Sequence, residues 1–175
     1  VQAICQCQGL IYVVAGENSS PVAMYLTTHL NICRPGVADL GSRAPFPVDR
    51  LLWVAPDDVL IAYSIRRYAQ DTLQAARYFR ECGATVLGIC DSMAAPVVRH
   101  AQHSLLVSTH NASPFDSYTA TFALCNALVS AVAQQLKDDV SQSLQKRDSL
   151  WARLQAQAGA AAGPSPRRSA RSKGK

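Results

Sequence analysis

The sequence predicts a three-layer α/β/α fold in which helices cover both faces of a five-stranded parallel sheet. Short apolar runs rich in β-branched residues alternate with longer helical patterns along the 175 residues, which is typical of βαβ units. The apolar runs are continuous, as expected for strands buried on both faces. Hydrophobic residues make up 49% and charged residues 17% of the chain, so the composition fits one compact domain rather than a disordered chain.

The first part of the chain is expected to hold three strands and two helices. Ser19 and Ser20 lead into the first helix, and Pro21 suits its first turn because that position needs no backbone N–H. The predicted elements are strands at 9–14, 37–40 and 58–63, a helix at 21–33, a loop at 44–47 and a short helix near 50–53.

The second part continues the alternation and ends in a long helical pattern. Gly83 is the residue best suited to a left-handed helix cap, so we expect the preceding helix to end there. The predicted elements are helices at 69–82 and near 96–100, strands at 84–90 and 104–107, and a helical pattern from near Ser117 to about Gln157, with a break around 137–139.

The net charge of +5 is concentrated at the C-terminus. Five arginines and lysines lie beyond residue 157, which leaves twelve basic and twelve acidic side chains in the rest of the chain. A neutral body offers no surface that would follow a phosphate backbone, so any electrostatic attraction to nucleic acid must come from the tail. We expect one domain over 1–157 and a disordered basic tail over 158–175, whose Ala, Gly, Pro, Ser, Arg and Lys residues cannot form a core.

Membrane and metal functions are disfavoured. The longest unbroken apolar run, 10–15, is far too short to span a bilayer. No secretory signal opens the sequence, so we expect a cytoplasmic protein whose six cysteines stay reduced. Cys5 and Cys7 lack a second pair at zinc-finger spacing, and His100 and His103 lack a carboxylate partner in sequence. We therefore expect no metal and no cofactor, with buried thiols and with histidines that are structural or exposed.

Three turns between predicted strands and helices are candidates for anion binding, because ligands of open α/β sheets bind beyond the carboxyl ends of the strands, near helix N-termini. Hydroxyl and guanidinium groups in these turns suit a phosphate. Alternatively, the polar residues serve only as helix caps, and the arginines lie on the surface or pair with Asp71 or Asp116. The candidate residues are Ser19 and Ser20 in the first turn, Ser64, Arg66 and Arg67 in the second, and Ser117 in the third.

Four segments carry a family resemblance. The most distinctive, 61–68, reads IAYSIRRY and is followed by Asp-Thr at 71–72, and the others are 11–19, 83–92 and 115–118. In order and spacing over about residues 3–135, they resemble the sugar isomerase (SIS) domain of RpiR-type bacterial transcriptional regulators. The resemblance implies a flavodoxin-like five-stranded parallel sheet, a phosphosugar site at the strand ends, and a homodimer or tetramer.

In such regulators the sugar phosphate is an effector, and a separate N-terminal helix-turn-helix domain reads DNA. The sequence starts at Val1, immediately before the first strand. We therefore expect that this chain is part of a longer protein and lacks that domain. Binding to DNA would then occur only through the missing domain.

The chain also departs from the family pattern. The family's first turn commonly reads Gly-x-Gly-x-Ser, but the glycine positions hold Ala15 and Glu17, which brings a negative charge near the expected phosphate. The second turn of SIS enzymes resembles Ser-x-Ser-Gly-x-Thr, of which this chain retains the first serine. The other three positions are Arg66, Arg67 and Ala69, and the two arginines would replace hydroxyl contacts with charge-assisted ones.

The leading functional prediction is a phosphosugar-binding effector domain of a transcriptional regulator of sugar metabolism, without enzymatic activity. The alternatives are a sugar-phosphate isomerase and an oligomerisation module with a decayed pocket. Isomerisation of an aldose needs a positioned base, and no residue is an obvious one. The segment 122–133 is apolar around much of a helix, which predicts self-association because such a helix needs burial on more than one side.

Overall fold

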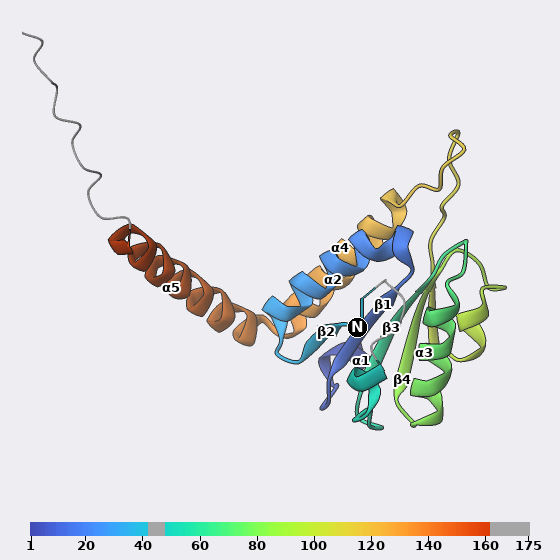
Figure 1. Ribbon diagram of the computed structural model, residues 1–175, viewed down its shortest axis with the longest axis horizontal. Coiled ribbons are helices and arrows are strands. Elements are labelled where there is room, and N and C mark those ends of the chain that lie inside the picture. The colour runs from blue at the N-terminus through green and yellow to red at the C-terminus, as the bar shows by residue number, and fades with distance from the viewer. Residues whose placement is uncertain (42–47, 162–175) are drawn as a thin grey trace, which may run out of the picture.

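The computed structural model describes residues 1–41 and 48–161, and it confirms the three-layer α/β/α architecture (Figure 1). A parallel sheet of five strands has the order β2-β1-β3-β4-β5, which is the order of the flavodoxin-like folds. The strands are β1 (Ile11–Ala15), β2 (Val37–Asp39), β3 (Val59–Ser64), β4 (Thr85–Cys90) and β5 (His103–Leu106).

Helices pack on both faces of the sheet. On one face α2 packs against β1 and β2 and also against α4, while on the other face α3 and the short 3-10 helix η3 pack against β4. The helices are α1 (Gln2–Cys5), α2 (Ser20–Cys33), α3 (Gln70–Glu81), α4 (Thr119–Gln135) and α5 (Lys137–Ala161), and the 3-10 helices are η1 (Glu17–Ser19), η2 (Val48–Leu51) and η3 (Pro96–Arg99).

The two central strands supply side chains to two separate cores, because successive residues of a strand point to opposite faces. All residues of β1 and β3 are buried. Ile11 and Val13 join the core beneath α2 and α4, whereas Tyr12 and Val14 join the core beneath α3. This burial on both faces explains why the strands are continuous apolar runs in the sequence.

The predicted elements are confirmed to within a few residues, and the turn chemistry explains their ends. Pro21 lies in the first turn of α2, and Gly83 after α3 has a φ of 81°, a conformation that glycine adopts without steric cost. Helix α1 was not predicted. The loop expected at 44–47 lies outside the described residues.

Two charged side chains, the buried Asp58 and the half-buried Arg34, make hydrogen bonds at the edge of the sheet opposite to the candidate anion-binding turns. The carboxylate of Asp58 accepts hydrogen bonds from the backbone N–H of Leu10 at 2.7 Å and of Ala55 at 2.9 Å. The guanidinium of Arg34, just after α2, donates to the carbonyl oxygens of Ile4, Cys7 and Gly9. These contacts fix where β1 begins.

The last helical pattern is broken at Leu136, close to the expected position, and α5 continues to Ala161, four residues beyond the expected domain boundary at 157. The rest of the predicted basic tail, 162–175, lies outside the described residues. Helix α4 buries one stripe of side chains, and the opposite face of the helix is exposed. Phe122, which is 40% exposed, lies at the edge of the buried stripe and contacts the ring of Tyr25 on α2. Helix α5 extends away from the body (Figure 1).

None of the described helices is long and apolar enough to cross a membrane. Within 1–41 and 48–161, no three His, Cys, Asp or Glu side chains gather where they could hold a metal ion. All six cysteines are free, and Cys5 and Cys7 are half-buried rather than buried as expected. His103 is exposed and His100 is half-buried.

Candidate functional site

The candidate site lies where the chain changes direction across the sheet. From β1 the chain crosses to β2 on one side, and β3 lies on the other side of β1. The helices that follow β1 and β3 therefore cover opposite faces of the sheet, and the turns that lead into them border a crevice, which is the position where open α/β sheets bind ligands. Helices α2 and α3 begin beside this crevice and direct backbone N–H groups toward it.

A cavity of about 260 Å³ opens at this crevice. The turn after β1, the turn after β3 and the start of α4 contribute its walls. Its lining residues are Gly16, Glu17, Asn18, Ser19, Tyr63, Ile65, Arg66, Arg67, Ala69 and Tyr118.

The two turns approach each other closely at Gly16. A Cβ atom at this position would lie 3.0 Å from the Cβ of Ala69, which is shorter than an ordinary van der Waals contact. A larger residue at position 16 would push the two turns apart. The glycine therefore allows the narrow crevice, although it is not one of the two glycines in the family pattern.

Three charged side chains line the cavity: Glu17, Arg66 and Arg67. The guanidinium of Arg66 lies 3.6 Å from the carboxylate of Asp116, and 70% of the Arg66 side chain is exposed. The sequence left both Asp71 and Asp116 open as partners for the arginines. In the structure, Arg66 pairs with Asp116. Arg67 is exposed, and the peptide bond that joins it to Arg66 is cis.

A second cavity, of about 550 Å³, adjoins the first at the ends of β4 and β5. Arg66 lines both cavities. Asp91, directly after β4, accepts a hydrogen bond from the backbone N–H of Arg66 through Oδ2, while its Oδ1 is buried without a partner among the described residues. Tyr68 and His110 also line this space, so hydroxyl, carboxylate and imidazole groups surround it.

The tyrosines of the site hold their protons more tightly than usual. Burial, followed by the negative charges of Asp116 and Asp91, raises the pKa of Tyr118. Burial, followed by the neighbouring carboxylate of Asp91, raises the pKa of Tyr68. Both hydroxyls are therefore hydrogen-bond donors at neutral pH, which suits the oxygen atoms of a sugar or a phosphate.

The structure brings together three of the six residues that the sequence singled out. Ser19, Arg66 and Arg67 line the first cavity, although the Ser19 hydroxyl already donates to the carbonyl of Gly16 at 3.3 Å. Ser64 is the last residue of β3, is only 3% exposed and lines neither cavity.

The other two candidate serines, Ser20 and Ser117, line neither cavity. Ser20 is half-buried as the first residue of α2 and does not line the cavities. The hydroxyl of Ser117 accepts a hydrogen bond from the backbone N–H of Thr119 and donates to its side chain. This is the local role at a helix start that was the alternative interpretation for such serines.

Sequence reasoning missed Tyr118, Tyr68 and Asp91. Each lies within a segment that carried the family resemblance, directly after a candidate serine or arginine or directly after a predicted strand. For Tyr68 and Asp91 the available signal was their position shortly after a strand, where parallel sheets collect functional groups. For Tyr118 it was the position next to the start of a predicted helix.

This geometry defines a class of protein: a flavodoxin-like α/β domain with a polar cleft at the topological switch point. The SIS domain family model matches residues 4–131. The chain therefore belongs to the SIS domain family, which confirms the resemblance. No protein with a curated description matches the chain.

Solved structures support the same assignment. The chain is similar to the sugar isomerase domain of an RpiR transcription factor from Sphaerobacter thermophilus, with 26% identity and a TM-score of 0.79 over 85% of this chain and 82% of that one. The fold is shared with the Vibrio vulnificus NanR protein complexed with ManNAc-6P, at 15% identity and a TM-score of 0.63 over 85% of this chain and 59% of that one.

The fold is also shared with a Methanococcus jannaschii protein whose structure was used to infer 3-hexulose-6-phosphate isomerase activity. Here the identity is 12% and the TM-score 0.64, over 81% of this chain and 80% of that one. The proteins that share this fold thus include a transcription factor and a protein for which isomerase activity was inferred.

Proposed function

We propose that this chain is the phosphosugar-binding effector domain of a transcriptional regulator of sugar metabolism. The observation that carries the proposal is the cavity at the switch point, where Arg66 and Arg67 meet the turn that leads into α2. Paired guanidinium groups and helix N-termini stabilise a phosphate. The similarity to the RpiR sugar isomerase domain supports the regulatory role.

The neighbouring cavity at the ends of β4 and β5 supports the proposal because it offers space for the sugar part of the ligand. A phosphate between the two turns leaves the rest of the ligand facing Tyr118 or, past Arg66, the space lined by Tyr68 and Asp91. Hydroxyl and carboxylate groups match the hydrogen-bonding pattern of a sugar. The structure of NanR, which shares the fold, is of a complex with ManNAc-6P, a ligand of this chemical class.

A thermal-shift screen tests the proposal. The full chain is heated with a panel of hexose and pentose phosphates, with the matching unphosphorylated sugars and with inorganic phosphate. A ligand at about 100 times its Kd should stabilise the folded state by about 2.7 kcal/mol. A rise in Tm with phosphosugars alone supports the proposal, and identical melting curves throughout contradict it.

A sugar-phosphate isomerase is the second candidate, because the carboxylate of Glu17 lines the cavity and a carboxylate can transfer the proton that aldose–ketose interconversion requires. Turnover distinguishes the two. Conversion of an aldose phosphate that disappears in a Glu17→Gln variant supports the enzyme, and stabilisation without turnover supports the sensor.

The proposed partners are the sugar phosphate and further copies of the chain, in a homodimer or tetramer located in the cytoplasm. Binding to DNA would occur through a helix-turn-helix domain outside this sequence. Residues 1–157 alone should therefore not retain an operator fragment specifically. A firm dimer that binds no phosphosugar would instead support an oligomerisation module.

A further inference from the structure

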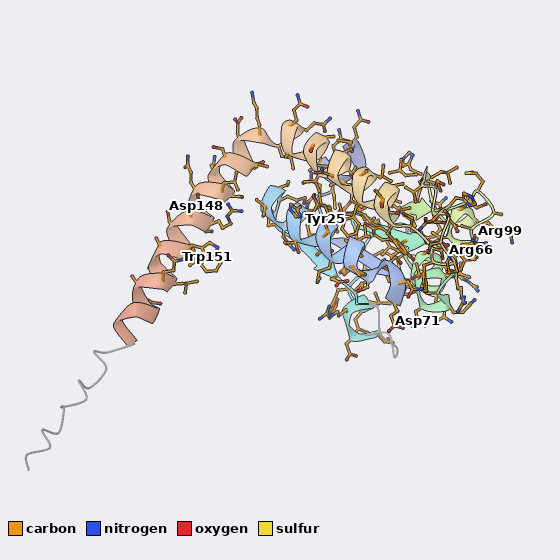
Figure 2. All side chains as sticks on the ribbon, turned by 90° about the horizontal axis from the view of Figure 1, so that it is seen from above. Tyr25, Arg66, Asp71, Arg99, Asp148 and Trp151 are labelled. Carbon is orange, nitrogen blue, oxygen red and sulfur yellow. The ribbon has the colours of Figure 1, made fainter. Side chains whose placement is uncertain are left out.

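Helices α2 and α4 form a layer without any charged side chain. The two helices pack against each other on one face of the sheet, and Figure 2 shows them side by side, with Tyr25 of α2 labelled. Their 14 and 17 residues include no Asp, Glu, Lys or Arg, although charged residues make up 17% of the chain. A helix face that stays in water normally carries charged or polar residues.

The other long helices of the chain are different. Helix α3, on the opposite face of the sheet, carries Asp71, Arg77, Arg80 and Glu81 among its 12 residues, and the last three of these are exposed. Helix α5 also carries charged residues of both signs. The lack of charge is therefore specific to the layer of α2 and α4. Depletion of charge is the compositional property that distinguishes the core of a protein interface from the rest of a surface.

Apolar side chains lie on the outside of this layer. Met24 of α2 is 60% exposed. The rings of Tyr25 and Phe122 meet edge to face with their centroids 5.6 Å apart, so they join the two helices at the surface. Ala123 and Ala127 of α4 are exposed, and such small side chains allow another helix to approach closely. We call the surface formed by these five residues the α2–α4 face.

Polar groups on and beside this face already have hydrogen-bond partners within the layer. The hydroxyl of Thr28 donates to the carbonyl oxygen of Met24 at 2.8 Å, and the hydroxyl of Tyr25 donates to Oδ1 of Asn126 at 3.3 Å. Nδ1 of His29 lies 2.8 Å from the carbonyl oxygen of Tyr25. A polar group costs free energy on burial mainly when it loses its hydrogen bonds to water without replacing them. These groups can therefore leave water at low cost.

We propose that the α2–α4 face of one copy of this chain packs against the same face of a second copy, around a two-fold axis. A two-fold axis sets a surface against itself, so it brings like charges together wherever a charged side chain lies near the axis. The α2–α4 face has no charge to bring together, whereas the exposed side of α3 has several. This inference rests on the self-association proposed above and specifies its surface.

Helix α5 of the same chain is not positioned to cover the face. Helix α4 ends at Gln135 and α5 begins at Lys137, so Leu136 alone connects them. Two antiparallel helices need a connection of about two to five residues, and α5 therefore cannot fold back along α4 while both helices keep their lengths. Leu136 and Val140 also pack against the core beneath α2 and α4, which fixes the direction in which α5 leaves the body (Figure 2).

The lack of charge also disfavours charged partners. A nucleic acid is bound through cationic side chains that neutralise its phosphates, and an acidic or basic protein surface is recognised by the opposite charge. The α2–α4 face offers neither sign of charge. A second copy of the chain supplies an equally uncharged surface, which matches it.

The experiment measures the mass of full-chain variants by light scattering over a range of micromolar concentrations. Met24→Glu with Ala123→Glu places two negative charges on the face. The matched control is Gln70→Glu with Gln74→Glu, which adds the same charge at two exposed positions of α3. We expect the wild type and the control to dimerise alike, and the face variant to dissociate at concentrations at least tenfold higher.

Opposite charges provide the decisive step. Met24→Lys with Ala123→Lys should weaken the dimer as the glutamates do, because it also sets like charges against each other. An equimolar mixture of the glutamate and lysine variants should form a heterodimer, so its mean mass should exceed that of either variant alone. Recovery in the mixture also shows that both variants are folded.

The outcomes separate the inference from the self-association on which it rests. A monomeric wild type overturns both. A dimer that resists the glutamate and the lysine variants uses another surface. Two variants that each dissociate and do not recombine show that the face does not meet its own copy. Either of the last two results overturns the inference and leaves self-association intact.

Discussion

The guanidinium of Arg66 lies 3.6 Å from the carboxylate of Asp116, and this contact connects the turn after β3 to the loop before α4. The same arginine lines both cavities at the strand ends. Asp116 therefore competes with any phosphate for the guanidinium. A phosphate that bound to Arg66 would therefore have to replace this ion pair.

Asp116→Asn should strengthen the binding of a phosphosugar by several-fold, because Arg66 becomes free to contact the ligand. The folded state should lose little stability, since ion pairs exposed to this degree contribute about 0.2–1 kcal/mol. Calorimetric titration measures the affinity. Glu81→Gln, which removes the exposed pair with Arg77 on α3, is the control and should leave it unchanged. Weaker binding in Asp116→Asn would show that Asp116 contacts the ligand itself.

Arg66→Ala and Arg67→Ala should each weaken phosphosugar binding. A hydrogen bond to a charged group contributes about 1.5–3 kcal/mol, which is about one to two decades in Kd. The Tm of the unliganded protein should change little because both side chains are exposed. Arg77→Ala, in an equally exposed position of α3, is the matched control. Unchanged affinity in both variants would exclude this turn from the site.

Glu17→Gln should tighten the binding of a phosphate group, because it removes a negative charge from the cavity wall. At a separation of about 4 Å in water the repulsion of two charges is about 1 kcal/mol, so we expect an improvement of less than about tenfold. Comparing inorganic phosphate with the phosphosugar shows whether the gain follows the anion. A loss of affinity for the sugar alone would show that Glu17 accepts hydrogen bonds from it.

Asp58→Ala should lower the free energy of unfolding by about 2 kcal/mol or more, because it deletes two hydrogen bonds from a carboxylate that is 4% exposed and strands two backbone donors. Urea denaturation measures the change. Asp57→Ala, at the exposed neighbouring position, should cost less than about 0.5 kcal/mol. Equal losses in the two variants would contradict the anchoring role of Asp58.

The stability of the protein should fall between pH 9 and pH 11 partly through Cys90. Burial, with a contribution from Asp91, raises the pKa of this thiol from 9.0 to about 11. The unfolded thiol loses its proton first, so this contribution is fully present below pH 9 and is lost as the pH rises to about 11. Urea unfolding across this range should show a smaller decline for Cys90→Ala than for the wild type, and parallel profiles would contradict the shift.

Much of the fold could be predicted because its signals are local. The buried run in β1 has no polar residue, and Gly83 terminates α3 in a conformation that disfavours other residues. The break near Leu136 was also visible, since charged residues interrupt the apolar pattern there. Helix α1 is only four residues long, too short for a periodic pattern to reveal it.

The site was less accessible from sequence, because side-chain direction decides it. Ser64 and Arg66 are two residues apart, yet the first is buried at the end of β3 and the second lies in the cavity wall. The choice between Asp71 and Asp116 as a partner for Arg66 depends on how a loop some 50 residues away folds back. Only the packed structure determines either relationship.

Helix α4 begins next to Tyr118, which lines the cavity between the turns after β1 and β3, and ends at Gln135, two residues before α5 begins. One continuous helix of 17 residues, α4, thus connects this cavity to α5. If α4 moves as one rigid rod, a ligand that displaces its start also moves α5, and a partner bound to α5 would shift the start of α4 in return. Thermodynamic linkage requires the two effects to be equal in free energy. Under the proposed self-association, the affinity for the proposed sugar phosphate would therefore depend on the concentration of the protein itself.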